Sequence, residues 1–158
     1  MATLYLICGL PGSGKTTLAR QLEREHNALR LCPDEWIAQI LADPGDRTEM
    51  DRLRDVVESI QWDVAKRALI TGVNVILENG FWSREERIRF RTEAEILGAD
   101  VELHYLSAGI DELWRRIEER NAELPAGTFH INRDELDEWA KLFETPSEDE
   151  MPFLTHSS

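Results

Sequence analysis

Cysteine, long apolar runs and positive charge are all scarce in this 158-residue sequence. Only two cysteines are present, Cys8 and Cys32, and each falls at the end of a segment with the composition of a buried strand. Two such residues do not make a disulfide framework, and we expect them to be buried thiols in a reducing cytoplasm. No apolar run reaches the length of a membrane span and no hydrophobic leader precedes the first strand, so we expect a cytoplasmic protein without a membrane anchor.

The charge balance is strongly acidic. Lysine and arginine number 18 against 31 aspartates and glutamates, which gives a formal net charge of −13 and an isoelectric point near 4.7. Such a surface repels nucleic acid and anionic membranes at long range, so a nucleic acid partner is not expected. Part of the acidity lies between Glu144 and Glu150, in an acidic tail of about residues 144–158 that we expect to be a solvated terminus.

One motif indicates a ligand. Residues 9–16 have the pattern G-x-x-x-x-G-K-[ST], with a strand-forming apolar run before them at 3–8 and an amphipathic helical pattern after them at 17–24. Glycines let backbone N–H groups converge on phosphate oxygens, and the helix N-terminus adds a positive dipole. Lys15 is predicted to reach the β- and γ-phosphates, and the Thr16 hydroxyl to bind Mg²⁺. The predicted nucleotide-binding residues are Gly9, Leu10, Pro11, Gly12, Ser13, Gly14, Lys15, Thr16 and Thr17.

Strand-like and helix-like segments alternate along the rest of the chain, which predicts a parallel sheet with helices on both faces. We expect one α/β domain over residues 1–158, with four strands, or five if the Pro152-containing segment 151–155 also forms one. The further strands are predicted at 28–32, 73–77 and 101–106, and the helices at 33–41, 48–70, 83–98, 110–117 and 132–143. The apolar stripe predicted for the 48–70 helix comprises Met50, Leu53, Val57, Ile60, Val64 and Ala68.

Ligands of parallel sheets bind beyond the carboxyl ends of the strands, which draws attention to the residues that follow each strand. Asp34 follows the second strand, where its carboxylate could accept the proton of an attacking hydroxyl or could simply cap the next helix. Glu78 ends the third strand, the usual place for an acid that holds Mg²⁺, although an ordinary loop acid would also fit. Phe81 and Trp82 could wall an acceptor pocket or pack under the following helix.

Arginines precede an irregular segment that we interpret as a lid of about residues 116–132. Arg116 and Arg120 are four residues apart and share a helix face, so a closing lid could bring both over the phosphates. The alternative is a solvated face that pairs with neighbouring glutamates, and Arg115 is assigned to solvent. Arg84, Arg87, Arg89 and Arg91 are expected at the surface, His104 in the core, and His130 in the lid, where it could touch substrate.

Four segments together resemble the small P-loop kinase group that includes the kinase domain of bacteriophage-type polynucleotide kinase and chloramphenicol phosphotransferase, many members of which are known only as AAA-type ATP-binding proteins. The resemblance covers most of residues 3–121. It implies a three-layer, nucleoside-kinase-like P-loop NTPase fold, Mg²⁺-ATP at the loop, Asp34 as general base, and Arg116 and Arg120 as lid arginines. The segments are G-L-P-G-S-G-K-T-T at 9–17, C-P-D-E at 32–35, V-I-L-E-N-G at 75–80 and R-I-E-E-R at 116–120.

The leading hypothesis is an ATP-dependent phosphotransferase that moves the γ-phosphate of Mg²⁺-ATP to a hydroxyl of a small molecule. A 5′-hydroxyl polynucleotide kinase is the first alternative, but that pattern has an arginine three residues after its aspartate, where this chain has Ile37. The second alternative is an NTP-dependent switch or assembly ATPase without a phosphoryl acceptor. The acceptor, the choice between ATP and GTP, and the oligomeric state stay open.

Overall fold

Strands and helices alternate in the computed structural model, which describes the backbone of residues 1–157 and the side chains of residues 1–150. The strands are β1 (Thr3–Cys8), β2 (Leu29–Leu31), β3 (Val75–Gly80), β4 (Asp100–Leu106) and β5 (Leu154–Ser157). The helices are α1 (Lys15–His26), α2 (Pro33–Ile40), α3 (Arg47–Ile70), α4 (Arg84–Ile96), α5 (Ile110–Glu123) and α6 (Arg133–Leu142), and a 3₁₀ helix spans Glu148–Phe153.

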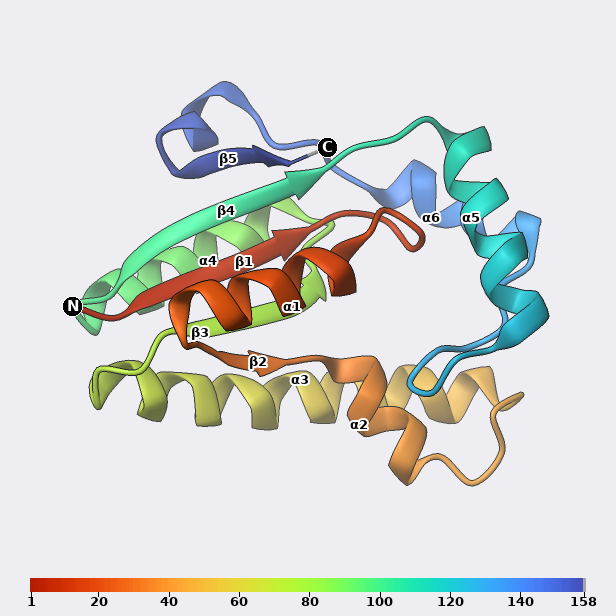
Figure 1. The fold of residues 1–158 in the computed structure, drawn as a ribbon, viewed down its shortest axis with the longest axis horizontal. Coiled ribbons are helices and arrows are strands. Elements are labelled where there is room, and N and C mark those ends of the chain that lie inside the picture. Colours follow the sequence, from red (N-terminus) through yellow and green to blue (C-terminus); the bar gives the residue numbers. More distant parts are fainter. Residues whose placement is uncertain (158) are drawn as a thin grey trace.

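The sheet has five parallel strands in the order β2-β3-β1-β4-β5, which confirms the predicted α/β fold with a parallel sheet. The fifth strand, left open by the sequence, begins at Leu154 and pairs with β4. Pro152 lies in the preceding 3₁₀ helix, where its missing N–H removes no hydrogen bond from the sheet. All strands point toward the same edge of the sheet, where the loop after β1 and helix α5 lie (Figure 1).

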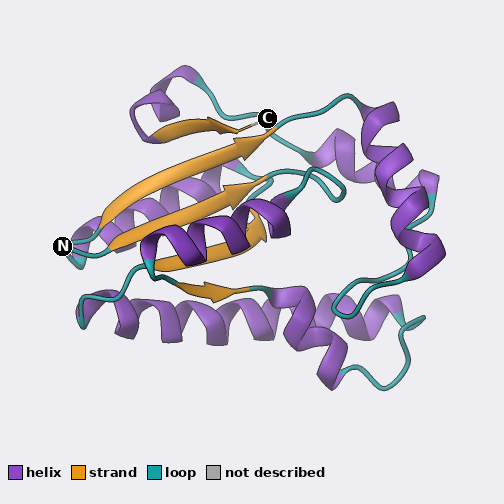
Figure 2. Ribbon diagram, viewed as in Figure 1, coloured by secondary structure: helices purple, strands orange, loops and turns teal. Residues whose placement is uncertain are grey.

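Helices cover both faces of this sheet (Figure 2). Because side chains alternate along a strand, β1 contributes to two cores. Tyr5 and Ile7 pack with residues of α1 on one face, whereas Leu4 and Leu6 pack with residues of α3 and α4 on the other. The central strand is therefore buried on both sides, as expected for a doubly covered parallel sheet.

In the longest helix, α3, the predicted Met50, Leu53 and Val57 are buried, but the second half of the helix turns a different face to the core. Ile60 and Val64, predicted to be buried, are 48% and 37% exposed. Gln61 and Ala65 are buried in their place, because the Trp62 ring packs against Phe90 at 4.6 Å between centroids and fixes the rotation of the helix. No helix among the described residues, α3 included, is both long and apolar enough to cross a membrane.

Strand β3 begins later and ends later than predicted, which places Glu78 within the strand rather than at its end. The sequence Glu-Asn-Gly is typical of a loop, but its backbone continues the sheet: Gly9 N–H donates to the Gly80 carbonyl at 2.9 Å. Gly80 and Phe81 then have φ angles of 85° and 49°, and the chain turns there toward α4. The extension holds the Glu78 side chain beside α1.

Both cysteines are buried thiols, as predicted. Burial raises the pKa of Cys8 and of Cys32 to about 12. Each thiol is therefore protonated at neutral pH and is a poor nucleophile or metal ligand.

Candidate active site

The loop between β1 and α1 ends in a helix N-terminus that no side chain caps and whose first turn carries no acid. Gly12 and Gly14 have φ angles of 83° and 95°, a left-handed conformation that glycine adopts without strain. A Cβ atom on Gly12 would lie 2.9 Å from the carbonyl oxygen of Leu113 in α5, so this position also has no room for a side chain. The uncapped N–H groups and the helix dipole form a site for an anion such as phosphate.

The Lys15 side chain lies in the cleft beside this loop. Its Nζ donates a hydrogen bond to the Leu10 carbonyl at 3.0 Å. Burial lowers the pKa of Lys15, and the negative charges of Asp34 and Glu78 oppose that shift. An ammonium group in this position would exchange one carbonyl partner for charged phosphate oxygens, which are stronger acceptors.

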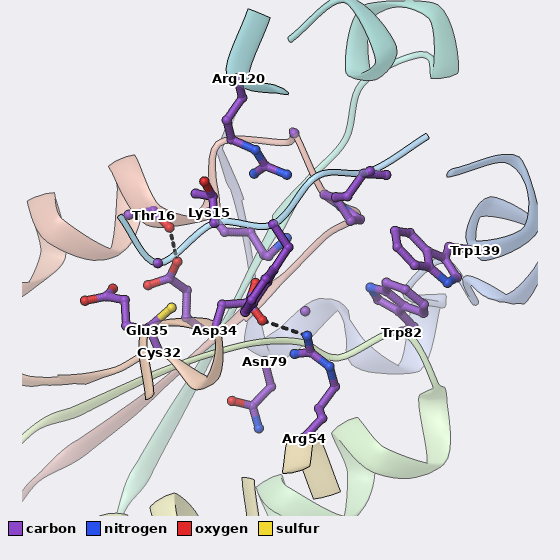
Figure 3. Close-up of a pocket in the computed structure, with 18 of the residues that line it drawn as sticks. Lys15, Thr16, Cys32, Asp34, Glu35, Arg54, Asn79, Trp82, Arg120 and Trp139 are labelled. Carbon is purple, nitrogen blue, oxygen red and sulfur yellow. Dashed lines mark hydrogen bonds and ion pairs between the residues drawn. The ribbon is translucent and has the colours of Figure 1, made fainter. Parts of the chain in front are cut away.

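Thr16 and Glu78, far apart in the sequence, meet at the start of α1. The Thr16 hydroxyl donates a hydrogen bond to Oε1 of Glu78, drawn as the dashed line from Thr16 in Figure 3. The other carboxylate oxygen, Oε2, accepts a hydrogen bond from Arg30 Nη1 at 2.8 Å. Arg30 in turn pairs with Glu35, and it was missed in the sequence, where the only signal is a charged residue in the middle of a short strand.

The oxygen donors of Thr16 and Glu78 fit Mg²⁺, a hard cation that prefers hydroxyl, carboxylate and water ligands. A second possible group comprises Cys32, Glu35 and Glu78, whose ligand atoms lie within 4.8 Å of one another. In that group the thiol is protonated and the Arg30 guanidinium already pairs with both carboxylates. The donor set therefore favours Thr16 and Glu78 as the residues that could hold Mg²⁺.

Asp34 lies in the first turn of α2 and lines the cleft. The N-cap of α2 is Cys32, so the interpretation of Asp34 as a helix cap was wrong: Pro33 takes the first helical position and moves Asp34 into the helix. Its Oδ1 accepts a hydrogen bond from Arg54 Nη2 at 2.7 Å (Figure 3). The sequence did not identify Arg54, since the partner is 20 residues away on α3.

The two arginines of α5 have different surroundings. Arg120 extends toward the cleft (Figure 3), its Nε is buried with no hydrogen-bond partner among the described residues, and burial lowers its pKa although Asp34 opposes the shift. Arg116 is more exposed and donates to the Gly12 carbonyl at 3.3 Å and to Glu112 at 3.0 Å. Arg115 pairs with glutamates at the surface, as predicted.

Aromatic side chains wall the end of the cleft beyond Asp34. The cleft has a volume of about 860 Å³, and Trp82, Trp139 and Phe129 line it. The two indoles meet at 5.8 Å between centroids, and Trp82 Nε1 donates to the Gly9 carbonyl at 3.3 Å. The His130 side chain is exposed and does not line the cleft, although residues on either side of it do. Such a wall suits a ligand with a flat or apolar part.

Acidic side chains occupy the same end of the cleft. Glu58 on α3 and Glu86 on α4 both line it, and neither has an ion-pair partner among residues 1–150. Burial, together with the charge of Glu86, raises the pKa of Glu58 to about 7. Burial also raises the pKa of Glu86. The cations at this end, Arg54 and Arg47, are already paired with carboxylates.

Replacing Glu58 with glutamine is expected to stabilise the protein at pH 8 but not at pH 4.5. Because the pKa is raised in the fold, the carboxyl loses favourable free energy as the pH rises from about 4.5 to about 7, by up to about 3 kcal/mol. The negative charges of Asp34, Asp55 and Glu86 also raise the pKa of Glu58, and the positive charge of Arg54 lowers it. Urea unfolding at both pH values measures the difference, with the exposed Glu118→Gln as control; equal effects of Glu58→Gln at the two pH values would contradict it.

The acidic tail is only partly the solvated terminus that we expected, because Glu144, Glu148 and Asp149 are exposed but Glu150 is buried. Glu150 is 1% exposed and pairs with Arg87 at 2.7 Å; Arg87, predicted at the surface, is 2% exposed. Arg87 Nη1 also donates to the Phe81 carbonyl at 2.8 Å, and Glu144 N–H donates to the Trp82 carbonyl at 2.7 Å. Residues 144–150, the C-terminal strap, thus hold the turn that carries Trp82.

Comparison with known proteins places this geometry in a family. A candidate kinase from Chloroflexus aurantiacus is 21% identical, with a TM-score of 0.76, and the match covers 98% of this chain and 86% of that one. Kti12 from Chaetomium thermophilum, in complex with ADP-AlF3, is 20% identical with a TM-score of 0.71, and the match covers 98% of this chain and 88% of that one. A gluconokinase from Sinorhizobium meliloti is 16% identical with a TM-score of 0.65, and the match covers 98% of this chain and 81% of that one. At these identities the likeness shows the fold, that of small P-loop kinases. A family model described as the AAA domain matches residues 4–146, and the chain therefore belongs to the AAA domain family of nucleotide-binding proteins.

Proposed function

We propose that this protein is a kinase that transfers the γ-phosphate of ATP to a hydroxyl group of a small molecule. The observation that carries the proposal is the position of Asp34, across the cleft from the phosphate-binding loop and next to an aromatic wall. A switch ATPase needs to place only a water molecule there. A cleft of about 860 Å³ that continues past Asp34 to Trp82 and Trp139 leaves room for an acceptor.

Different residues of the chain would take the proton and stabilise the charge during phosphoryl transfer. Asp34 Oδ1 is held by Arg54, which leaves Oδ2 to take the proton of the acceptor hydroxyl as its oxygen bonds to the γ-phosphorus. The bond from the γ-phosphorus to the bridging oxygen breaks, and ADP leaves with the electron pair. Lys15, together with Arg116 and Arg120 on a lid of about residues 116–132, offsets the charge that develops on the phosphate oxygens.

Thr16 and Glu78 are the residues that would hold Mg²⁺. The hydrogen bond from Thr16 to Glu78 directs the hydroxyl proton toward the carboxylate, so that the oxygen lone pairs remain free for a cation. When bound, Mg²⁺ would neutralise charge on the β- and γ-phosphate oxygens. Both cysteines are buried thiols, which is compatible with the proposed cytoplasmic location.

The acceptor end of the cleft favours an uncharged or positively charged compound over a polynucleotide. Glu58 and Glu86 lack ion-pair partners among the described residues, whereas Arg54 and Arg47 have theirs. A phosphate backbone would meet the negative charge of these acids there, and carboxylates already pair with the two arginines at this end. The net charge of −13 acts in the same direction.

Release of ADP from Mg²⁺-ATP tests the proposal. The reaction is run without an acceptor, with pools of small hydroxyl compounds (nucleosides, sugars, amino sugars and amino alcohols), and with 5′-hydroxyl oligonucleotides. We expect one small-molecule pool to raise the rate. Stimulation by oligonucleotides alone would favour the polynucleotide kinase, and a rate that ignores every pool would favour a switch ATPase.

Replacing Asp34 with asparagine is expected to lower transfer to the stimulating acceptor by about 10²–10⁴-fold, because the amide cannot take the hydroxyl proton. The dissociation constant for ATP should change by less than about 2-fold, since phosphate binding relies on the loop. Arg54→Met is the matched variant: it removes the ion pair but keeps the carboxylate, and we expect a smaller loss. Equal losses in both variants would mean that Asp34 acts only by holding Arg54.

A further inference from the structure

Arg30 does not line the cleft, yet it contacts the carboxylate that we assign to the metal. Its side chain is 11% exposed. Nη1 lies 2.8 Å from Glu78 Oε2 and 2.6 Å from Glu35 Oε2, and Nη2 lies 2.9 Å from Glu35 Oε1. The guanidinium is thus held by Glu35 at two points and by Glu78 at one. Glu35 fixes the guanidinium, and the guanidinium fixes Glu78.

The two oxygens of Glu78 face different partners. Arg30 occupies Oε2, and the Thr16 hydroxyl donates to Oε1. A carboxylate with one oxygen held by a buried arginine has lost most of its rotational freedom, and its second oxygen points in one direction. Here that direction is toward Thr16, at the start of the phosphate-binding helix.

We propose that Arg30, braced by Glu35, is a positioning residue that orients Glu78 toward Thr16 and so sets how strongly Mg²⁺ and the nucleotide bind together. This inference rests on the proposed function, because it requires Mg²⁺ at Thr16 and Glu78. It goes beyond that function in naming two residues that contact no phosphate in the proposed site, Arg30 outside the cleft and Glu35 at its lining, as those that decide whether the metal site is assembled. The role is geometric, since the planar guanidinium can reach both carboxylates at once and the ammonium of lysine cannot copy that fork.

The experiment measures ADP binding by calorimetry with and without Mg²⁺, so that no catalytic step enters. The dissociation constant without Mg²⁺ divided by the constant with Mg²⁺ measures the coupling between metal and nucleotide. In Arg30→Gln we expect this ratio to fall by about 10-fold or more, with the Mg²⁺-free dissociation constant within about 2-fold of the unchanged protein. Arg30→Lys should recover only part of the coupling. Arg24→Gln, an exposed arginine of α1, is the control and should change neither constant.

Each other outcome overturns the inference. An unchanged ratio in Arg30→Gln would mean that Glu78 needs no support, and a raised ratio would mean that Arg30 competes with the metal. Equal weakening of ADP binding with and without Mg²⁺ would indicate a general loss of structure. Full recovery of the coupling in Arg30→Lys would mean that the positive charge at position 30, and not the guanidinium geometry, supports Glu78. Glu78→Gln separates this inference from the proposed function. If the unchanged protein shows no coupling, the metal assignment itself fails; if Glu78→Gln loses coupling and Arg30→Gln keeps it, only the role of Arg30 fails.

Discussion

Replacing Lys15 with alanine is expected to lower ADP release by about 10²–10³-fold while leaving the free energy of unfolding unchanged or higher. The loss of rate follows because the ammonium is the cation nearest the phosphate-binding loop, and such a charge is worth most in a water-poor cleft. The effect on stability has the opposite sign because burial lowers the pKa of Lys15, which means that the folded protein holds this charge at a cost.

The measurement pairs single-turnover ADP release with urea unfolding of the nucleotide-free protein. Lys141→Ala is the control, since Lys141 is 73% exposed and pairs with its helix neighbour Glu138. Both quantities should stay unchanged in this control. Wild-type activity in Lys15→Ala would contradict the assignment of the phosphate site, and lower stability would contradict the account of the buried ammonium.

Replacing Arg87 with alanine is expected to lower the free energy of unfolding by about 3–5 kcal/mol. Arg87 and Glu150 are 2% and 1% exposed, so the substitution leaves the buried Glu150 carboxylate without its close cation, with Arg84 at 3.9 Å and the Ser147 N–H as remaining partners. The Phe81 carbonyl loses its donor as well. An exposed ion pair would be worth far less, typically about 0–1 kcal/mol, and burial is what makes this one consequential.

Arg89→Ala, on the exposed side of the same helix, is the control for helix propensity and charge. The double variant Arg87→Leu with Glu150→Leu removes both charges and should recover much of the lost stability, because two apolar groups replace an ion pair without leaving a bare charge. A loss below about 1 kcal/mol in Arg87→Ala would mean that Glu150 reaches water in solution. A double variant no better than the single one would mean that packing, not charge, sets the effect.

Features that depend on neighbours in the sequence could be predicted well. β1 was placed residue for residue, since an apolar run followed by a glycine-rich loop leaves little freedom. The last helix was predicted at 132–143, and it begins with a capping box that Asn132 and Glu135 form. Local hydrogen bonds and backbone preferences decide such features, and the sequence displays both.

Charge partners could not be predicted, because they depend on which elements the fold brings together. Arg87 was assigned to the surface together with the other arginines of α4, but its partner Glu150 is 63 residues away. Arg30 on β2 pairs with Glu78 on the neighbouring strand β3, and Arg54 on α3 pairs with Asp34 on α2. The end of β3 was misplaced for a related reason: Glu-Asn-Gly is loop-like in composition, and only pairing with β1 keeps it in the sheet.

The contact between Trp82 and Trp139 gives the protein an optical signal of its own. Two indoles 5.8 Å apart and inclined by 44° couple their electronic transitions, so this pair should contribute a paired positive and negative band to the circular dichroism spectrum. Among residues 1–150, Trp36, Trp62 and Trp114 form no indole–indole contact, although Trp114 packs against the same apolar cluster as Trp139. A compound that enters between the indoles or turns one of them would change the paired band without any label. Screening for the unknown acceptor therefore needs no assay of turnover, only a spectrum.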